Sequence, residues 1–213
     1  MPPPEARAGL AALAAAHPEF AGIEAAAGPL PWRRRTPGFA GLLQAIMGQQ
    51  ISNQAAAAIW GRLALLPGAL TPAGLLALDE AVLRGAGLSR PKVAHARALA
   101  EAYADGRLDD ARIAGQDDAA AIAAITAVRG LGPWTAEVYL LFALERMDVF
   151  PAGDIALAGA LAHLRGLPVR PNPAVLRLES ASWAPWRSLA ARLLWHHWRH
   201  ITGRPAMDDL PVA

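Results

Sequence analysis

Gly130-Leu131-Gly132-Pro133-Trp134-Thr135-Ala136, a tight turn between two helical segments, is the most informative part of this chain. Two glycines permit backbone angles that other residues avoid. Pro133 suits the first turn of a helix, where its missing N–H costs no hydrogen bond. A helix that Asp117 caps leads into the turn, and a helix from Pro133 leads out of it. The order predicts a helix-hairpin-helix over about 117–145, whose turn amides would bind a phosphate oxygen. An ordinary glycine-rich turn is the alternative.

The rest of the chain is also typical of helices. Alanine and leucine dominate at helical spacing, and alternating runs of β-branched and polar residues are nearly absent. We therefore expect an all-α fold of roughly ten helices with short connections. In chain order the expected helices cover 6–16, 18–27, 39–49, 53–66, a short one from 71, 79–85, 90–104, 117–128, 133–145, 155–164, a short one from 173, and 185–201.

Composition limits the class of protein. The 213 residues are 54% hydrophobic, yet no apolar run is long enough for a membrane span. The opening Met1-Pro2-Pro3-Pro4-Glu5 lacks the basic and apolar regions of a signal peptide, so cytoplasm is the expected location. The absence of cysteine excludes disulfides, thiolate zinc sites and cysteine-ligated iron–sulfur clusters. A net charge of +2 allows a local basic patch but proves no polyanion partner.

Asp154 ends the segment Phe150-Pro151-Ala152-Gly153-Asp154 and begins a helix. An aspartate at such a place is usually only a helix cap. An ionised carboxylate near a bound polyanion has a second use, because it can stabilise positive charge on a sugar or activate water against it. Trp134, just inside the helix after the turn, has no amine to form a Schiff base, but it offers a π-face to a flat or cationic base. Packing in the core is the alternative for Trp134.

Three further groups of residues allow two interpretations each. Arg90 and Lys92 open a helix whose start suits a second phosphate, but a solvated charged face explains them equally well. Trp32-Arg33-Arg34-Arg35 is either a DNA-contacting loop or a connector. His196, His197 and His200 suggest a metal site, because 196 and 200 lie one helical turn apart. There is no Glu at 197 and no clear third ligand, so packed or exposed histidines are favoured.

Together these residues resemble the helix-hairpin-helix (HhH-GPD) DNA glycosylase superfamily, in its alkylpurine (3-methyladenine DNA glycosylase II) branch. The resemblance covers about residues 37–200. It is carried by Ala45-Ile46-Met47-Gly48-Gln49-Gln50-Ile51-Ser52, Gly87-Leu88-Ser89-Arg90-Pro91-Lys92, residues 129–136, Val149-Phe150-Pro151-Ala152-Gly153-Asp154 and Trp183-Ala184-Pro185-Trp186-Arg187-Ser188 running to Trp195.

The resemblance implies two packed helical subdomains with a cleft between them. One would be the central part, 37–150; the other would combine the N-terminal helices, 1–36, with the C-terminal part, 151–213. Asp154 would be the catalytic residue at the cleft. The residues that contact DNA would be Gln49, Gln50, Ser89, Arg90, Lys92, Gly130, Gly132 and Thr135. Gln49 and Gln50 would enter the gap that a flipped nucleotide leaves.

The resemblance also implies a base pocket with Trp134 and Trp195. Two pocket aromatics of the branch are replaced here by Val138 and Ile155. Trp134 stands where bifunctional members have a lysine, which implies base removal without strand cleavage. The carbonyls of Thr126, Val128 and Leu131 would hold a monovalent cation.

We therefore expect a monomeric, monofunctional glycosylase that flips alkylated purines out of duplex DNA and hydrolyses the N-glycosidic bond, without a redox cofactor or catalytic metal. An alkylated purine is positively charged and so already a good leaving group, which suits a site with one carboxylate and electron-rich rings. The alternatives are a glycosylase of the same superfamily for uracil, hypoxanthine or an oxidised purine, and a non-catalytic DNA-binding module.

Overall fold

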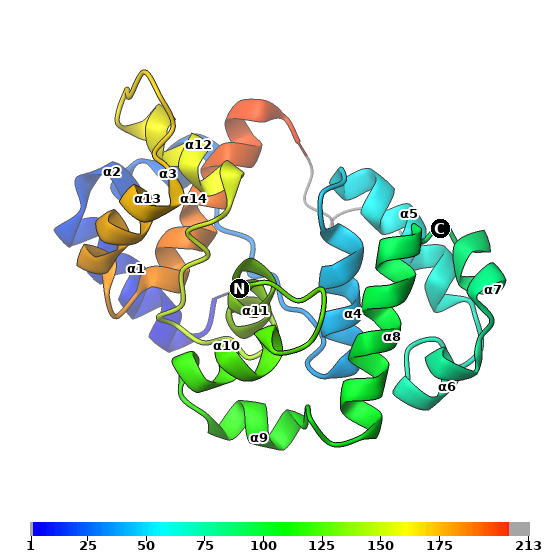
Figure 1. Ribbon diagram of the computed structural model, residues 1–213. Helices are drawn as coiled ribbons and strands as arrows, with labels where there is room; N and C mark the ends of the chain where they lie inside the picture. The colour runs from blue at the N-terminus through cyan, green and yellow to red at the C-terminus, as the bar shows by residue number, and fades with distance from the viewer. Residues whose placement is uncertain (1, 205–213) are drawn as a thin grey trace. The chain divides into compact units, whose positions relative to one another are not determined.

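A computed structural model describes residues 2–204, and these fold entirely as helices and connecting segments, with no strand in that range (Figure 1). The predicted all-α class is confirmed. No helix within 2–204 has the length and apolar character that crossing a membrane requires. The chain forms two compact units. We call residues 2–34 with 145–204 the terminal unit, and residues 35–144 the central unit.

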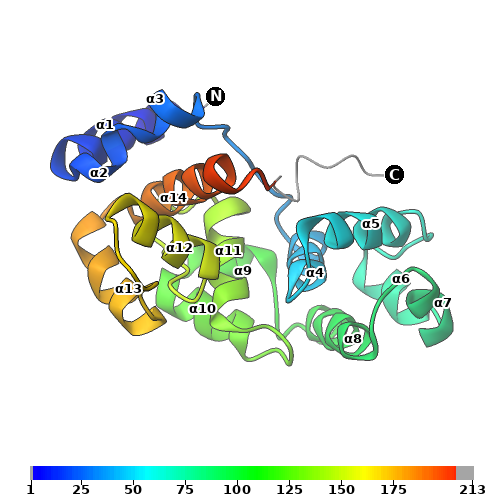
Figure 2. The ribbon, with the colours of Figure 1, turned by 90° about the horizontal axis from the view of Figure 1, so that it is seen from above.

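The terminal unit is built around its last helix, α14. It comprises α1 (Pro4–Ala16), α2 (Pro18–Ala21), α3 (Ile23–Ala27), α12 (Ile155–Leu164), α13 (Pro173–Ser180), the 3₁₀ turn η1 (Ala181–Trp183) and α14 (Arg187–Thr202). α14 packs against α12, α1 and α3 (Figure 2). Gly159 allows the close approach of α12, since a Cβ there would overlap the Trp198 ring. The buried Trp183 ring meets Phe20 and Phe150 edge to face, at 5.3 and 5.2 Å between centroids.

The central unit is built around α4 and α8, which lie side by side (Figure 1). Its helices are α4 (Phe39–Gly48), α5 (Asn53–Ala64), α6 (Pro72–Ala77), α7 (Glu80–Gly85), α8 (Arg90–Ala104), α9 (Asp110–Gly115), α10 (Asp118–Thr126) and α11 (Pro133–Phe142). The apolar stripe of α4 is buried between α8 and α11, and it includes Leu42, Leu43, Ile46 and Met47. Burial of this stripe fixes where α4 ends, and therefore where the segment after it begins.

The predicted helix starts are mostly confirmed by their caps. The side chains of Ser52, Ser89, Asp117 and Asp154 each accept a hydrogen bond from a backbone amide in the first turn of the following helix. Several ranges differ from the prediction. The expected helix 18–27 is two short helices, α2 and α3, on either side of Gly22, and the expected helix 6–16 begins already at Pro4. The expected helix 133–145 ends at Phe142, and the expected helix 185–201 begins only at Arg187. Helix α9 was not predicted, although Asp109 caps it by accepting a hydrogen bond from the amide of Arg112.

The boundaries between the units fall at 34/35 and 144/145. Residues 145–150, expected in the central part, have their contacts in the terminal unit. The contacts of α1 and α3 with α14 join N-terminal and C-terminal helices in one unit. The C-terminal part of the predicted division, 205–213, lies outside the described residues.

Candidate functional site

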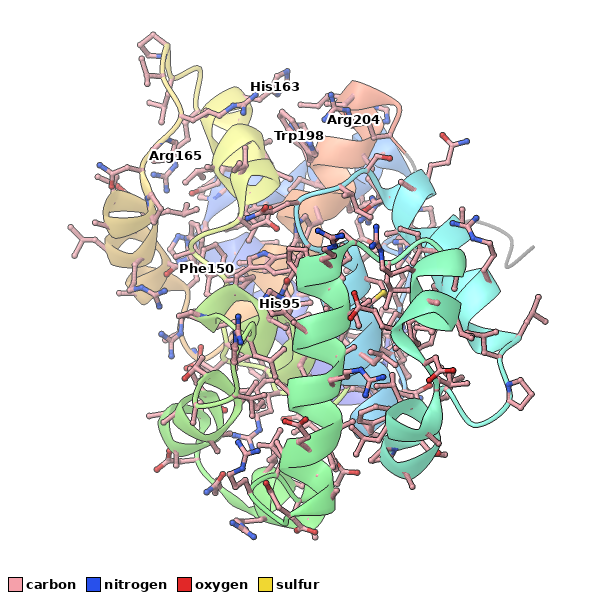
Figure 3. The ribbon with its side chains drawn as sticks, turned by 45° about the vertical axis from the view of Figure 1, so that its right-hand side comes forward. His95, Phe150, His163, Arg165, Trp198 and Arg204 are labelled. Carbon is pink, nitrogen blue, oxygen red and sulfur yellow. The ribbon has the colours of Figure 1, made fainter. Side chains whose placement is uncertain are left out.

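The turn between α10 and α11 is a closed hairpin with one glycine that another residue could replace only under strain. The amide of Leu131 donates to the carbonyl of Val128 at 3.1 Å. Gly130 has φ +90°, in the left-handed region, and a Cβ there would overlap the His95 ring of α8 (His95 is labelled in Figure 3). Gly132 differs from the expectation. Its φ is −89°, an ordinary value, and a Cβ there would meet no described atom within 4 Å. Gly130 is needed for the turn, whereas Gly132 leaves the start of α11 open.

Helix α11 begins without a side-chain cap. Its N-cap is Gly132, which has no side chain to cap the first turn, and Pro133 follows it. An uncapped helix start with an open approach has the chemistry of an anion site, since its amides and dipole favour negative charge. The geometry therefore fits the predicted phosphate contact at the hairpin.

The residues between α4 and α5, 49–52, form a short segment that we call the Gln loop. The side-chain amide of Gln49 donates to the carbonyl of Gly130 and to the hydroxyl of Thr135, both at 3.0 Å. Thr135 is only 2% exposed, so its hydroxyl faces the protein and not solvent. The structure thus brings Gln49, Gly130 and Thr135 together, and it joins the Gln loop to the hairpin by side-chain hydrogen bonds. Both donors of the Gln49 amide are used in these bonds, so the geometry favours an anchoring role for Gln49 over its predicted entry into the duplex gap.

Gln50 projects from the Gln loop. Its side chain is exposed, and its φ is +58°, a left-handed value that residues other than glycine seldom adopt. Ser52 then caps α5 by accepting from the amide of Ala55 at 3.2 Å. The predicted role of Gln50 in filling a gap in a duplex requires an exposed side chain on a defined loop, and the geometry fits that role.

The predicted role of Lys92 in DNA contact requires an exposed side chain, but Lys92 is buried. The side chain is 8% exposed, and its ammonium donates to the carbonyls of Ile46, Met47 and Gln49 at 2.7, 2.9 and 3.1 Å. Burial lowers the pKa of Lys92 from its ordinary value. An ammonium has three donors, and all three are used inside the protein. This geometry favours a structural role over direct contact with a phosphate.

Ser89 and Arg90, by contrast, are exposed at the start of α8. The hydroxyl of Ser89 accepts from the amide of Lys92 at 3.4 Å and so caps the helix. Arg90 is the exposed cation beside that cap. Their DNA contacts stay a prediction that the surface position allows.

Asp154 lies in the terminal unit, at the start of α12. One oxygen, Oδ1, accepts from the amides of Ala156 and Leu157 at 2.8 and 3.0 Å. The carboxylate is half-buried and lies at the start of the helix, next to the amides of its first turn. Both interpretations of Asp154 are therefore compatible with the structure: it is a cap, and it is an oriented carboxylate.

The segment before Asp154 is attached to the start of α14. Val149 is tied twice to Ser188: its amide donates to the hydroxyl, and its carbonyl accepts from the same hydroxyl, each at 2.9 Å. Asp148 forms a bidentate pair with Arg187, at 2.8 Å to Nε and 2.9 Å to Nη2. The Phe150 ring packs on Trp183. These contacts fix the path of the chain that leads to Asp154.

The four predicted pocket residues differ in exposure. Trp134 on α11 and Trp195 on α14 are half-buried, as expected of rings with one accessible face. Val138 is buried in the central unit, whereas Ile155 is 70% exposed, directly after Asp154. Val138 is part of the hydrophobic core, so it is not exposed to a ligand. It could affect a base pocket only indirectly, by supporting Trp134 one helical turn earlier. Ile155 is available to a ligand.

The open alternatives for two other groups are narrowed by their contacts. The indole of Trp32 and the guanidinium of Arg34 both donate to Oε1 of Glu145, at 2.9 and 2.8 Å, which favours the connector interpretation of 32–35. His197 pairs with Nδ1 of His163 at 3.0 Å, and His196 pairs with the carbonyl of Gly28 at 2.8 Å. Within 2–204 no three metal-ligating side chains of the His, Cys, Asp or Glu type gather in one place.

The implied monovalent cation would need oxygen ligands from the hairpin. Carbonyls are the correct type of donor for such an ion, and the Val128 carbonyl lies in the closed turn, where it already accepts from Leu131. The donor chemistry of Thr126, Val128 and Leu131 therefore fits, and the cation stays a prediction.

Sequence reasoning missed the residues that hold these segments in place. Ser188 and Asp148 were given no role of their own, whereas His95 and Lys92 were both interpreted as part of a basic surface that faces DNA. The only signal for Ser188 was its position in the matched segment 183–188. No sequence signal indicates that His95 packs on Gly130, because that contact depends on how α8 lies against the hairpin.

Comparison with known proteins gives a consistent group of relatives. A family model described as "HhH-GPD superfamily base excision DNA repair protein" matches residues 43–187. The chain is 31% identical over 161 residues to DNA-3-methyladenine glycosylase 1 of Schizosaccharomyces pombe, covering 72% of this chain and 69% of that protein. It is 35% identical over 168 residues to the probable bifunctional transcriptional activator/DNA repair enzyme AlkA of Mycobacterium tuberculosis, covering 74% of this chain and 33% of that protein.

Among solved structures, the chain is similar to the 3-methyladenine DNA glycosylase (Mag1) of Schizosaccharomyces pombe in complex with abasic DNA. The TM-score is 0.82 at 25% identity, over 90% of this chain and 95% of that one. The chain thus spans nearly all of one relative whose structure is known and about a third of the Mycobacterium tuberculosis protein.

Proposed function

The chain belongs to the HhH-GPD superfamily of base excision DNA repair proteins, and we propose that it removes alkylated purine bases from duplex DNA by hydrolysing the N-glycosidic bond. The resemblance to the alkylpurine branch, predicted from the motifs, is confirmed by relatives that are named 3-methyladenine glycosylases. The observation that carries the proposal is Asp154, a carboxylate that two backbone amides orient at a helix start. The resemblance of its segment to the alkylpurine branch implies that it is the catalytic aspartate.

The chemistry asked of Asp154 is electrostatic. An N3- or N7-alkylated purine carries positive charge, so the bond to the sugar breaks with little acid assistance. As it breaks, positive charge develops on the sugar, and the carboxylate of Asp154 stabilises that charge and orients the attacking water. The base must first leave the helix stack, and Trp134 and Trp195 would hold it by stacking and cation–π attraction.

The DNA is held through its backbone. The open start of α11 at Gly132 binds one phosphate, and the exposed start of α8 at Ser89 and Arg90 binds a second. Such contacts are independent of sequence, which suits a protein that must find a lesion in any context. A monovalent cation on the carbonyls of Thr126, Val128 and Leu131 would add positive charge at the first of these phosphates.

Strand cleavage by a Schiff base requires a free amine near the sugar. Lys92 is the only lysine in the sequence, and its ammonium is buried against three carbonyls. Trp134 occupies the place of the lysine in bifunctional members. Both observations support a monofunctional enzyme. A monomer and a cytoplasmic location complete the proposal.

The experiment is release of free bases from methylated duplex DNA by the wild type and by Asp154→Asn. Asparagine also caps helices well, so the variant keeps the start of α12 and loses only the charge. We expect it to bind an abasic duplex as the wild type does and to release 3-methyladenine and 7-methylguanine about 10²- to 10³-fold more slowly. Nicks should form only after alkali.

Asp117→Asn is the matched control, because Asp117 caps α10 in the same way through the amide of Ala120. It should release base at the wild-type rate. Wild-type turnover in Asp154→Asn would refute the mechanism. Release only of uracil, hypoxanthine or an oxidised purine from a panel of single-lesion duplexes would favour another glycosylase of the superfamily. Duplex binding without release from any lesion would favour a non-catalytic binding module.

A further inference from the structure

Lys92 is an unusual residue to find buried. It is the only lysine in the chain, it is 8% exposed, and the three hydrogen bonds of its ammonium all go to backbone carbonyls. Removing an ammonium from water is costly, so a buried one normally has a structural or functional reason. The proposed chemistry uses Asp154 and the tryptophans, and it leaves Lys92 without a task.

The three carbonyls are those at the end of α4. The last four carbonyls of a helix lack partners within the helix, and the helix dipole makes that end negative. Lys92 satisfies the carbonyls of Ile46 and Met47 in the last turn and that of Gln49 just beyond it. One cation on α8 therefore holds both the end of α4 and the first residue of the Gln loop.

Gln49 is held on a second side as well. Its side-chain amide donates to Gly130 and Thr135, while its backbone carbonyl accepts from Lys92. The next residue, Gln50, has φ +58° and an exposed side chain. A non-glycine residue in this conformation is strained and persists only where its surroundings enforce it. The surroundings here are the two anchors of Gln49.

We propose that Lys92 is a positioning residue, which presets the Gln loop so that Gln50 enters the gap in the duplex without first having to be ordered. The inference rests on the proposed function, because it assigns a purpose to Gln50 in DNA. Ordering a side chain before binding spares the entropy that binding would otherwise lose. Lys92 thus acts through Gln50 and touches neither the base nor the sugar.

The test compares two affinities of the same protein. One duplex is intact, and the other carries a tetrahydrofuran abasic analogue, which offers a gap. Lys92→Met keeps the length and apolar stem of the side chain and removes its donors. We expect the preference for the abasic duplex to fall about five- to tenfold, with intact-duplex affinity almost unchanged. The ratio of the two affinities does not depend on the fraction of folded protein, so a merely structural role would leave it unchanged.

Arg97→Met is the matched control. Arg97 lies on the same helix and donates to the carbonyl of Leu78, at the end of α6, at 2.6 Å. It holds a helix end as Lys92 does, but not the Gln loop, so this variant should keep the preference. Gln50→Ala should lower the preference on its own, and adding Lys92→Met to it should lower it no further, because both act on one step.

If Lys92→Met does not fold, Gln49→Met carries the test, since it removes the other anchor of the loop without leaving carbonyls of α4 unpaired. The same loss of preference is expected. An unchanged preference in folded Lys92→Met or in Gln49→Met, or additive losses with Gln50→Ala, would overturn the positioning role. A wild type that prefers the abasic duplex but releases no base would overturn the proposed catalysis alone, and the role of Lys92 would still be decided by the affinity ratio.

Discussion

The two segments that carry the predicted chemistry are held in place in different ways. The segment before Asp154 is held at Val149 by a neutral hydroxyl, Ser188, which pairs with both backbone groups of that residue. It is also held at Asp148 by a partly exposed ion pair with Arg187. The Gln loop is held by a buried cation, Lys92, on carbonyls alone. Asp154 also caps its own helix, whereas the helix after the hairpin starts without a cap. The terminal unit thus fixes a carboxylate, and the central unit keeps an open, positive helix start.

The hairpin gives the largest expected effect, in a contrast between its two glycines. Gly130→Ala would place a Cβ at φ +90° and against the His95 ring, which should cost about 3 kcal/mol of stability in urea unfolding. Gly132→Ala meets open space at φ −89° and should change stability by less than about 0.5 kcal/mol while weakening duplex binding. Equal stability losses in the two variants would contradict the assigned roles. His95→Ala should recover part of the loss in Gly130→Ala.

The anchor of the Asp154 segment comes next. Ser188→Ala leaves the amide and carbonyl of Val149 buried without their partner, which should cost about 1–3 kcal/mol of the unfolding free energy. Base release should slow, because the path of the chain to Asp154 loosens. Ser182→Ala is the control: its exposed hydroxyl donates to the carbonyl of Glu179, and losing it should matter by less than about 0.5 kcal/mol. Unchanged stability and an unchanged rate of base release in Ser188→Ala would contradict the anchoring role of Ser188.

Acidification should lower the free energy of unfolding through one histidine in each unit, His197 and His95. The loss should be smaller than that caused by the substitutions above. Burial, then the nearby histidines His163, His200 and His196, lower the pKa of His197 from its ordinary 6.5. Burial, then Arg129 and Lys92, lower that of His95. The unfolded chain therefore takes up these protons at higher pH than the folded protein does. Stability is full above about pH 6.5 and falls as the pH drops below that value.

The measurement is the unfolding free energy between pH 7.5 and 5, for the wild type, His197→Gln and His95→Gln. Each variant should show a shallower loss with acid than the wild type. A wild type whose stability rises on acidification through this range would contradict the direction of both pKa shifts.

The smallest expected effect concerns the segment 32–35. The Arg34 side chain is 61% exposed and pairs with Glu145, so Arg34→Met should change stability by less than about 1 kcal/mol. As a connector residue it should also leave the salt dependence of duplex binding unchanged. Arg90→Met, at the proposed second phosphate, should reduce the slope of log K against log salt by about 0.9. A similar reduction in Arg34→Met would restore the DNA-contacting interpretation.

The sequence was a good guide where local rules decide the structure. The caps at Ser52, Ser89, Asp117 and Asp154 each depend on one side chain and the first turn beside it, and all four form. The all-α class follows from composition and spacing.

Burial was the limit of that reasoning. Lys92 and Thr135 resemble surface residues in the sequence, and only the packing of α4 against α8 and α11 turns them inward. The sequence does not distinguish Gly130 from Gly132, yet the contact with His95 makes Gly130 indispensable to the turn. Local patterns thus located the candidate site, while tertiary contacts determined which of its residues face outward.

Ile155 follows Asp154 and is 70% exposed, so almost no burial energy holds that position to one side chain. The helix start there is secured by Asp154 itself, whose oxygen takes the amides of the next two residues. Mutations at 155 can therefore accumulate by neutral drift at little cost in folding. Because Ile155 is also a predicted pocket residue, a library that aims to change the range of accepted lesions should begin at this position.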